Sequence, residues 1–476
     1  MSNGLGRSPA DPVPIHGELR MSRHRWLLPL MFPMLASLSA CGGGSPLNPG
    51  PADDGILKIW WNEGYYPEET EAVRQAVNAW AAESGVETEL IFYSEKDLVQ
   101  FIENAATTGD APDIIYGQTI EPSLLPRLAW EGRLANTTDV VEPVQDLYTP
   151  AALEGVSYLN RETGERSFYG VPIAQQTTHL HYWKSLLAQI GRSPTDIPQD
   201  WQGFWQFWQD VQAPMRQSGL GEDFYSIGLP MSPAATDTSY QFEQFLEAFG
   251  VNLLSPEGEL LANDPQVVQG IAEALRSYTS FYSEGYVPPN ALEWGDPDNN
   301  VIFLSRLTAM TANPTLSIPG SQLQDAATYQ EQMGTTLWPN KPTGEPMRYV
   351  SSIKQVVIWA DSPQEEEAKA FLSYFIQPEN LAGFIEGAQG RYFPVMPTLL
   401  QQDFWTNPDD PHISVAAQQF ENTRPLNTVL NPAYSEIQAQ NIWGNAIQSI
   451  LTNQATPEEA AETAMAEIKQ IFSEWK

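Results

Sequence analysis

The 476-residue sequence contains a single cysteine, Cys41, and has few basic residues. One cysteine cannot form an intramolecular disulfide or a multi-cysteine zinc site. Only 24 Lys and Arg stand against 59 Asp and Glu, which gives a formal net charge of -35. This excess repels nucleic-acid phosphates and anionic lipid surfaces, so we expect no nucleic-acid partner and no direct membrane contact of the folded body. The acidity most simply keeps the protein soluble and identifies no ligand.

The common catalytic and cofactor motifs are also absent. There is no Gly-x-Ser-x-Gly, His-Glu-x-x-His or Gly-Lys-Ser/Thr sequence and no Gly-x-Gly-x-x-Gly after a strand, so we predict no enzyme and no cofactor. A glycoside hydrolase stays an alternative, because it needs only two well-placed carboxylates. His179 and His181 lie two apart in an expected strand and therefore share a face. We interpret them as ordinary strand residues and predict no metal site.

Long apolar runs are missing except near the N-terminus. Basic residues after Met21 precede the apolar run 26–38, and small residues then lead to Cys41. This order is typical of a cleavable secretory signal, and the run is too short to span a bilayer as a mature helix. Leu38-Ser39-Ala40-Cys41-Gly42 also resembles the bacterial lipobox. We therefore predict a signal peptide over residues 1–40, with the true start at Met21, and a lipidated, flexible tether rich in Gly, Pro and Asp over residues 41–54.

The chain after the tether alternates between strand and helix patterns. Ile56–Trp61 places Leu57, Ile59 and Trp61 on one face of an expected strand, and a helix follows from Pro67 to a stop at Gly85. A strand over 86–93, a helix capped by Ser94 and an apolar run over 113–116 come next. This order predicts a parallel α/β sheet. Further helices are expected at about 240–250, 264–283, 363–376 and 457–475.

A series of landmarks, in order along the chain, resembles the bacterial extracellular solute-binding proteins of the maltose-binding type. They are Lys58-Ile59-Trp60-Trp61-Asn62, Pro112-Asp113-Ile114-Ile115, Glu131-Gly132-Arg133-Leu134, Tyr169-Gly170-Val171-Pro172, Tyr182-Trp183-Lys184, Trp201, Gly285-Tyr286-Val287 with Trp294, Phe303 with Ala309-Met310, Glu365 to Leu372 and Gly390-Arg391-Tyr392-Phe393-Pro394. Two positions depart from the family pattern. Trp183 stands where Asn is common, and Leu304-Ser305-Arg306 replaces a usual Gly-Lys, which leaves the ligand more open than the fold.

The resemblance implies a periplasmic-binding-protein-like α/β fold, with two α/β lobes, a hinge and a ligand cleft between the lobes. Lobe one would comprise 55–174 plus 355–402, and lobe two 175–354 plus 403–476. Chain crossings between the lobes are expected near 172–176, 349–354 and 402–408. The implied function is that of the extracytoplasmic, lipid-anchored solute-binding subunit of an ABC importer. It would act as a monomer and deliver its ligand to the transmembrane subunits of the permease.

Some candidate ligand contacts follow from position alone. In sheets of parallel strands, ligands meet the loops at the carboxyl ends of the strands. Trp61, Glu63 and Tyr65 end or follow the first expected strand, and Tyr116 and Gln118 end or follow the third. We therefore predict these five residues as ligand contacts.

The family resemblance adds further candidates. They are Gln176 and Thr177 at the first crossing, Tyr240 at the start of a helix, Trp294, Asn313 after a strand, Arg391, and Trp443 in a C-terminal helix. For Trp443, filling a helix interface is an equally good interpretation. Trp61, Trp294 and Trp443 are the expected stacking faces for a sugar ring.

The predicted ligand is a neutral carbohydrate, because planar amides suit hydroxyl groups and aromatic faces suit the C–H side of a sugar ring. An organic cation such as a polyamine is the alternative within the binding class, since Glu63, Glu121 and Asp237 could hold ammonium groups together with aromatic rings.

Overall fold

The computed structural model describes residues 54–108 and 111–475. The predicted signal peptide, Cys41 and all of the tether except Asp54 lie outside these residues. Within the described part, the helices are α1 Pro67–Ser84, α2 Glu95–Thr108, α3 Leu125–Trp130, α4 Thr138–Val141, α5 Pro150–Glu154, α6 Lys184–Gln189, α7 Trp201–Met215, α8 Thr236–Ala248, α9 Pro265–Ser283, α10 Asp298–Leu304, α11 Ser317–Gly320, α12 Glu365–Phe375, α13 Pro378–Gly387, α14 Pro397–Leu400, α15 Asp403–Thr406, α16 Ile413–Ala417, α17 Tyr434–Ala439, α18 Ile442–Asn453 and α19 Pro457–Glu474.

The predicted strand–helix alternation at the start of the described chain is confirmed. Strands β1 (Ile56–Asn62), β2 (Glu87–Tyr93) and β3 (Ile114–Tyr116) run parallel, with β1 between the other two. Helix α1 begins at Pro67 and ends before Gly85, which adopts φ 76°. This left-handed conformation is easiest for glycine, so the residue that the sequence marks as a stop ends the helix. The Ser94 hydroxyl accepts a hydrogen bond from the Asp97 N–H at 3.3 Å and so caps α2.

Three strands extend this sheet across the molecule. β11 (Tyr349–Ile358) pairs antiparallel with β3 near its end and with β6 (Val171–Thr177) along its middle, and it pairs parallel with β12 (Thr423–Pro425) at its start. Every residue of β6 and β11 is buried. β12 is the third of these strands. It lies further along the chain than the crossing expected near residues 402–408. A short antiparallel hairpin, β4 (Ser157–Leu159) and β5 (Arg166–Phe168), is separate.

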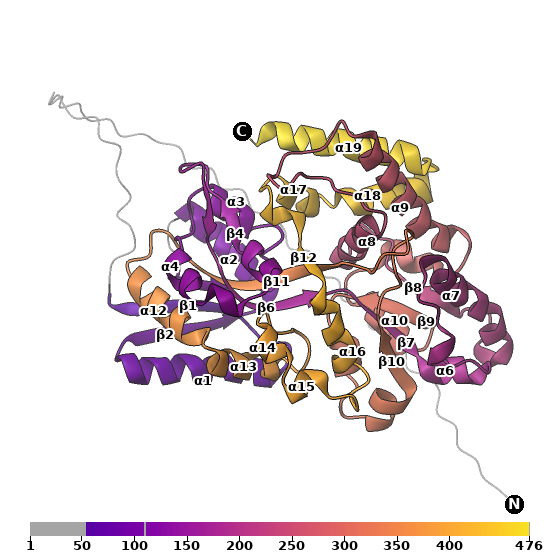
Figure 1. Cartoon of the computed structure of the whole chain (residues 1–476), viewed down its shortest axis with the longest axis horizontal. Coiled ribbons are helices and arrows are strands. Elements are labelled where there is room, and N and C mark those ends of the chain that lie inside the picture. Colours follow the sequence, from indigo (N-terminus) through magenta and orange to yellow (C-terminus); the bar gives the residue numbers. More distant parts are fainter. Residues whose placement is uncertain (1–53, 109–110, 476) are drawn as a thin grey trace, which may run out of the picture. The chain divides into compact units, whose positions relative to one another are not determined.

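A second sheet has the order β10-β7-β9-β8. Its strands are β7 (His179–Trp183), β8 (Tyr225–Gly228), β9 (Thr308–Asn313) and β10 (Met333–Thr336). β7 pairs antiparallel with β9 and β10, whereas β8 and β9 are parallel. In Figure 1, β1 and β2 lie with α1 and α12 on one side of the body, β8 to β10 lie with α7 on the other, and β6 and β11 run between them.

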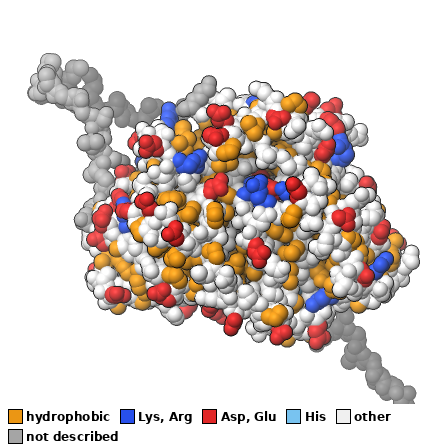
Figure 2. All heavy atoms as spheres, viewed as in Figure 1, with side chains coloured by type: hydrophobic (Ala, Val, Ile, Leu, Met, Phe, Trp, Pro, Cys, Tyr) orange, Lys and Arg blue, Asp and Glu red, His pale blue; other side chains and the backbone are white. Residues whose placement is uncertain are grey.

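The described residues contain two large hydrophobic cores. The first core includes Leu57, Ile59 and Trp61 of β1 together with side chains from α1, α12, α13 and residues 405–420. The second core is built from α7, α8, α9, α18 and α19 around the second sheet. Both cores bury several aromatic rings. Figure 2 shows acidic side chains scattered over one face with few basic side chains among them.

The three histidines of the described chain gather in one buried cluster. His181 Nδ1 lies 3.0 Å from the Thr335 hydroxyl, which lies 2.7 Å from His412 Nδ1, and His179 hydrogen-bonds to the Gln419 side chain. Burial lowers the pKa of His179 and of His412 to about 4. No set of three or more His, Cys, Asp or Glu that could hold a metal ion occurs within 54–108 and 111–475.

Candidate functional site

A polar pocket lies where loops of both sheets approach the strands β6 and β11. Its lining comes from the start of α2, the loop after β3, the start of α8, the loop after β9, and the residues around Arg391. The lining residues are Glu95, Gln118, Thr119, Gln176, Thr236, Asp237, Tyr240, Asp296, Asn313, Pro314, Thr315, Ser317, Lys354, Arg391 and Tyr392. Amides, hydroxyls, carboxylates and two tyrosine rings therefore converge on one space, as in small-molecule sites.

The floor of the pocket contains a buried ion pair. Lys354 of β11 contacts the Glu121 carboxylate and donates a hydrogen bond to the Gln118 carbonyl oxygen at 2.5 Å. Both side chains are almost fully buried. Burial raises the pKa of Glu121 and lowers the pKa of Lys354, because water no longer solvates either charge, although each partner opposes the shift of the other. The pair fixes the loop after β3 to β11.

Arg391 forms one side of the pocket between two tyrosine rings. Its guanidinium carbon lies 4.9 Å from the ring centre of Tyr392 and 5.2 Å from that of Tyr65. One terminal nitrogen donates to the Gln118 side-chain oxygen, and the other lies 3.5 Å from the Glu69 carboxylate. The arginine is thereby held by stacking and by charge at once, which orients its planar group.

The opposite side of the pocket is built on α8 and the loop after β9. Asp237 accepts a hydrogen bond from the Asn299 amide at 3.2 Å, and its backbone N–H donates to Asp296 at 3.1 Å. Burial raises the pKa of Asp237 well above its usual range, and the nearby charge of Asp296 raises it further. The Asn313 amide donates to the Thr315 carbonyl at 2.7 Å, which folds the loop back into the pocket.

Tyr66 connects the two sides near the pocket. A Cβ atom placed on Gly320, at the end of α11, would lie 2.0 Å from the Tyr66 hydroxyl oxygen. Gly320 therefore leaves room for the Tyr66 hydroxyl to lie against α11, and a larger residue there would displace this side chain. Leu316, which follows the pocket residue Thr315, packs into the first core although it comes from the loop after β9. The two sides thus touch next to the pocket.

Five of the predicted contact residues line this pocket: Gln118, Gln176, Tyr240, Asn313 and Arg391. Tyr65 does not line it but stacks on Arg391 with 55% of its surface exposed. The Thr177 hydroxyl donates to the Val350 carbonyl at 2.8 Å and so joins β6 to β11. Glu63 is exposed and lies outside the lining.

The three tryptophans expected to stack on a sugar lie in the hydrophobic cores instead. Trp61 packs against Tyr116 with ring centres 4.5 Å apart, and both are buried in the first core. Trp294 is 2% exposed in the second core. Trp443 is also buried there, and its indole N–H donates to Glu243 at 3.3 Å. Trp61, Tyr116, Trp294 and Trp443 are all buried, and none of them lines the pocket.

Several lining residues were not singled out from the sequence. Thr315 and Ser317 directly follow Asn313 in the loop after a strand, so the rule that selected Asn313 could have included them. Lys354 is the one charged residue within β11, a signal for a buried, paired lysine. Tyr392 belongs to the same landmark as Arg391, so that landmark could have included it, whereas Asp296 has no such signal.

Comparison with known proteins agrees with the fold. Residues 75–414 match the model of the bacterial extracellular solute-binding protein family, which is more than half of the chain. The chain therefore belongs to the bacterial extracellular solute-binding proteins, whose members bind ligands outside the cytoplasm. No curated protein sequence matches significantly.

Solved structures of solute-binding proteins share the fold at low sequence identity. An ABC transporter solute-binding protein from Thermotoga lettingae TMO, bound with α-D-tagatose, is 20% identical with a TM-score of 0.69, covering 87% of this chain and 99% of that one. Maltose-bound T. maritima MalE3 is 17% identical with a TM-score of 0.66, covering 87% and 100%. A sugar transporter from Arthrobacter chlorophenolicus A6 with bound laminaribiose is 15% identical with a TM-score of 0.65, covering 87% and 99%. No helix of residues 54–108 and 111–475 is long and apolar enough to span a membrane.

Proposed function

We propose that the protein is the solute-binding subunit of an ABC importer and captures a neutral carbohydrate in the pocket described above. The observation that carries the proposal is the lining itself. Side-chain amides of Gln118, Gln176 and Asn313 and hydroxyls of Thr236, Thr315 and Ser317 converge there beside the rings of Tyr240 and Tyr392. Amides and hydroxyls can both donate to and accept from sugar hydroxyls, and a tyrosine ring can cover the C–H side of a sugar.

The cation alternative has weaker support. Of its three proposed anchors, only Asp237 lines the pocket. Glu121 is already paired with Lys354, and Glu63 is outside the lining. We likewise propose binding without turnover, since the family and the neighbouring structures are binding proteins.

The proposal includes two lobes that close on the ligand. Lobe one would surround the first core and lobe two would surround the second core. Residues 403–420 would belong to lobe one, because they pack in the first core. The strands β6, β11 and β12 would form the hinge. Lipid attachment at Cys41, a monomeric state and delivery to the permease subunits complete the proposal. Closure predicts a smaller radius of gyration in solution scattering when ligand is bound.

Calorimetric titration tests the proposal with D-tagatose, maltose, laminaribiose and spermidine. We expect binding of at least one sugar, no binding of spermidine, and no product after prolonged incubation. Gln176→Ala should weaken sugar binding, whereas Gln189→Ala, an exposed glutamine on α6, should not. Binding of spermidine alone would favour the cation alternative, and release of a sugar product would favour the hydrolase.

A further inference from the structure

Helix α8 connects the proposed pocket to a second polar cluster. Asp237 and Glu247 lie ten residues apart in α8, which at a rise of ~1.5 Å per residue places them about 15 Å apart along the helix axis. Asp237 and Tyr240, in its first turns, line the pocket. Gln244 and Glu247, in its last turns, contact the strands between the two cores. These four residues are spaced by three, four and three positions, so they lie on one face of the helix.

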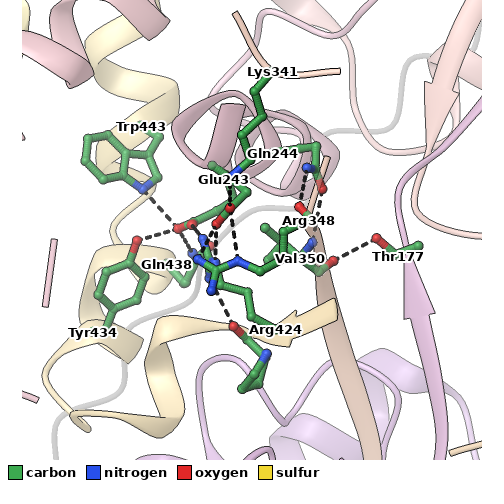
Figure 3. Close-up of polar contacts among 12 residues, drawn as sticks. Thr177, Glu243, Gln244, Lys341, Arg348, Val350, Arg424, Tyr434, Gln438 and Trp443 are labelled. Atoms are coloured by element: carbon green, nitrogen blue, oxygen red, sulfur yellow. Dashed lines mark hydrogen bonds and ion pairs between the residues drawn. The ribbon is translucent and has the colours of Figure 1, made fainter. Parts of the chain in front are cut away.

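Glu247 lies at the centre of this second cluster, which we call the junction cluster: Glu243, Glu247, Lys341, Arg348 and Arg424. Glu247 accepts hydrogen bonds from Lys341 at 2.7 Å, from Nε and Nη2 of Arg348 at 3.0 and 2.9 Å, and from Arg424 at 2.7 Å. Its own side chain is 3% exposed. Figure 3 shows the three cations converging on the end of α8 from separate segments of the chain.

Two of the cations, Arg348 and Arg424, belong to the segments that run between the cores. Arg348 immediately precedes β11, and Arg424 lies in β12. Gln244 strengthens the same contact, because its amide donates to the Arg348 carbonyl at 3.0 Å and accepts from the Val350 N–H at 3.0 Å. The end of α8 is therefore fixed to the starts of two strands by one carboxylate and one amide.

β11 also reaches both places. Arg348, of the junction cluster, directly precedes β11, the N–H of Val350 near its start donates to Gln244, and Lys354 lies further along the strand in the pocket floor. α8 and β11 thus each have one end at the junction cluster and another part at the pocket. Fixing them to each other at the junction also fixes where Tyr240 lies relative to Lys354.

We propose that Glu247 is a positioning residue for ligand binding: through Arg348 and Arg424 it sets the placement of α8 on the strands between the cores, and so the alignment of the two sides of the pocket. The inference rests on the proposed function for its binding consequence. Glu247 does not line the pocket, so any effect on affinity would pass through the helix.

The test replaces Glu247 by Gln, which keeps the shape and removes the charge, in the full chain. Glu467→Gln on α19 is the matched control, because Glu467 is exposed and its side chain forms no hydrogen bond or ion pair within residues 54–108 and 111–475. Each protein is titrated with D-tagatose, maltose and laminaribiose, and its amide hydrogen exchange is followed by mass spectrometry without sugar. Arg348→Gln is a second variant, chosen because the Arg348 side chain is 41% exposed and its loss leaves Glu247 two other cations.

We expect Glu247→Gln to weaken sugar binding at least tenfold and to speed exchange in residues 236–250 and 347–356, with Glu247→Asp in between and the control unchanged. Arg348→Gln should show the same pattern more weakly, which keeps the proposal testable if Glu247→Gln does not fold. Unchanged affinity and exchange would overturn the proposal. An acceleration in α9 and α19 as large as that in residues 236–250 and 347–356 would also overturn it, because a uniform increase marks general destabilisation. If wild type binds none of the sugars, the proposed function fails, and the exchange pattern alone decides the role of Glu247.

Discussion

The pKa values of two buried carboxylates in this protein, Glu121 and Glu247, shift in opposite directions. Glu121, in the pocket floor, contacts one cation, Lys354, and burial raises its pKa. Burial by itself would also raise the pKa of Glu247, at the junction cluster, but Arg348, Arg424 and Lys341 together lower it to about 2. One cation does not offset the loss of water around a buried charge, whereas three do. Glu247 is therefore firmly ionised, whereas a single cation compensates the Glu121 charge only in part.

The largest expected effect comes from removing the single cation of the pocket pair. Lys354→Met leaves Glu121 buried without a cation, and breaking a buried pair in this way costs about 3–5 kcal/mol. Urea unfolding at pH 7 measures the free energy of unfolding. The double variant Lys354→Met, Glu121→Leu should recover much of the loss, because apolar replacement of the whole pair is close to neutral. A single variant within about 0.5 kcal/mol of wild type, the usual range for surface substitutions, would contradict the importance of this pair.

The second-largest effect is the loss of stability at low pH that follows from protonation of Glu247. The Glu247 pKa falls from the usual 4.5 to about 2, so its ionised form stabilises the folded state fully above pH 4.5, and that contribution is lost as pH falls towards 2. The shift corresponds to about 3 kcal/mol at neutral pH. Glu247→Gln should lose this amount at pH 7 in urea unfolding and less at pH 3. A difference from wild type that stays constant between these pH values would show that ionisation is not the cause.

A neutral donor at the junction cluster should matter less than these charges. The Tyr434 hydroxyl donates to the buried Glu243 carboxylate, and loss of a hydrogen bond to a charged group costs about 1.5–3 kcal/mol. Tyr434→Phe should therefore lower the free energy of unfolding by about 2 kcal/mol. Tyr65→Phe at the pocket rim is the control, since that ring is 55% exposed. Equal losses in the two variants would argue against a specific role for the Glu243 contact.

The smallest loss of stability is expected where other cations stay paired with the same carboxylate. Lys341→Met leaves Glu247 paired with Arg348 and Arg424, so we expect a loss of about 1 kcal/mol or less. Compared with Lys354→Met by the same urea titration, this variant measures directly how the number of cations changes the cost of losing one. A loss as large as that of Lys354→Met would disprove the comparison between the two carboxylates.

The sequence predicts the local elements well, because the signals for them are local. Pro67 and Gly85 mark the two ends of α1, and Ser94 caps α2. Gln118, which the rule that ligands meet the loops after parallel strands selected, lines the pocket, and so does Asn313, which also follows a strand. The alternation Leu57, Ile59, Trp61 also places Trp61 on the buried face of β1, which explains why it packs in the first core.

The sequence by itself determined the alternation of strands and helices over residues 56–116, the excess of acidic residues and the family to which the chain belongs. It did not determine which aromatic rings reach the pocket, since Trp294 and Trp443 differ from a ligand-facing tryptophan only in what packs over them. It also could not pair Glu247 with Lys341, Arg348 and Arg424, which are 94, 101 and 177 residues away. Contacts over such distances leave no periodic pattern in one sequence, so only the tertiary structure decided them.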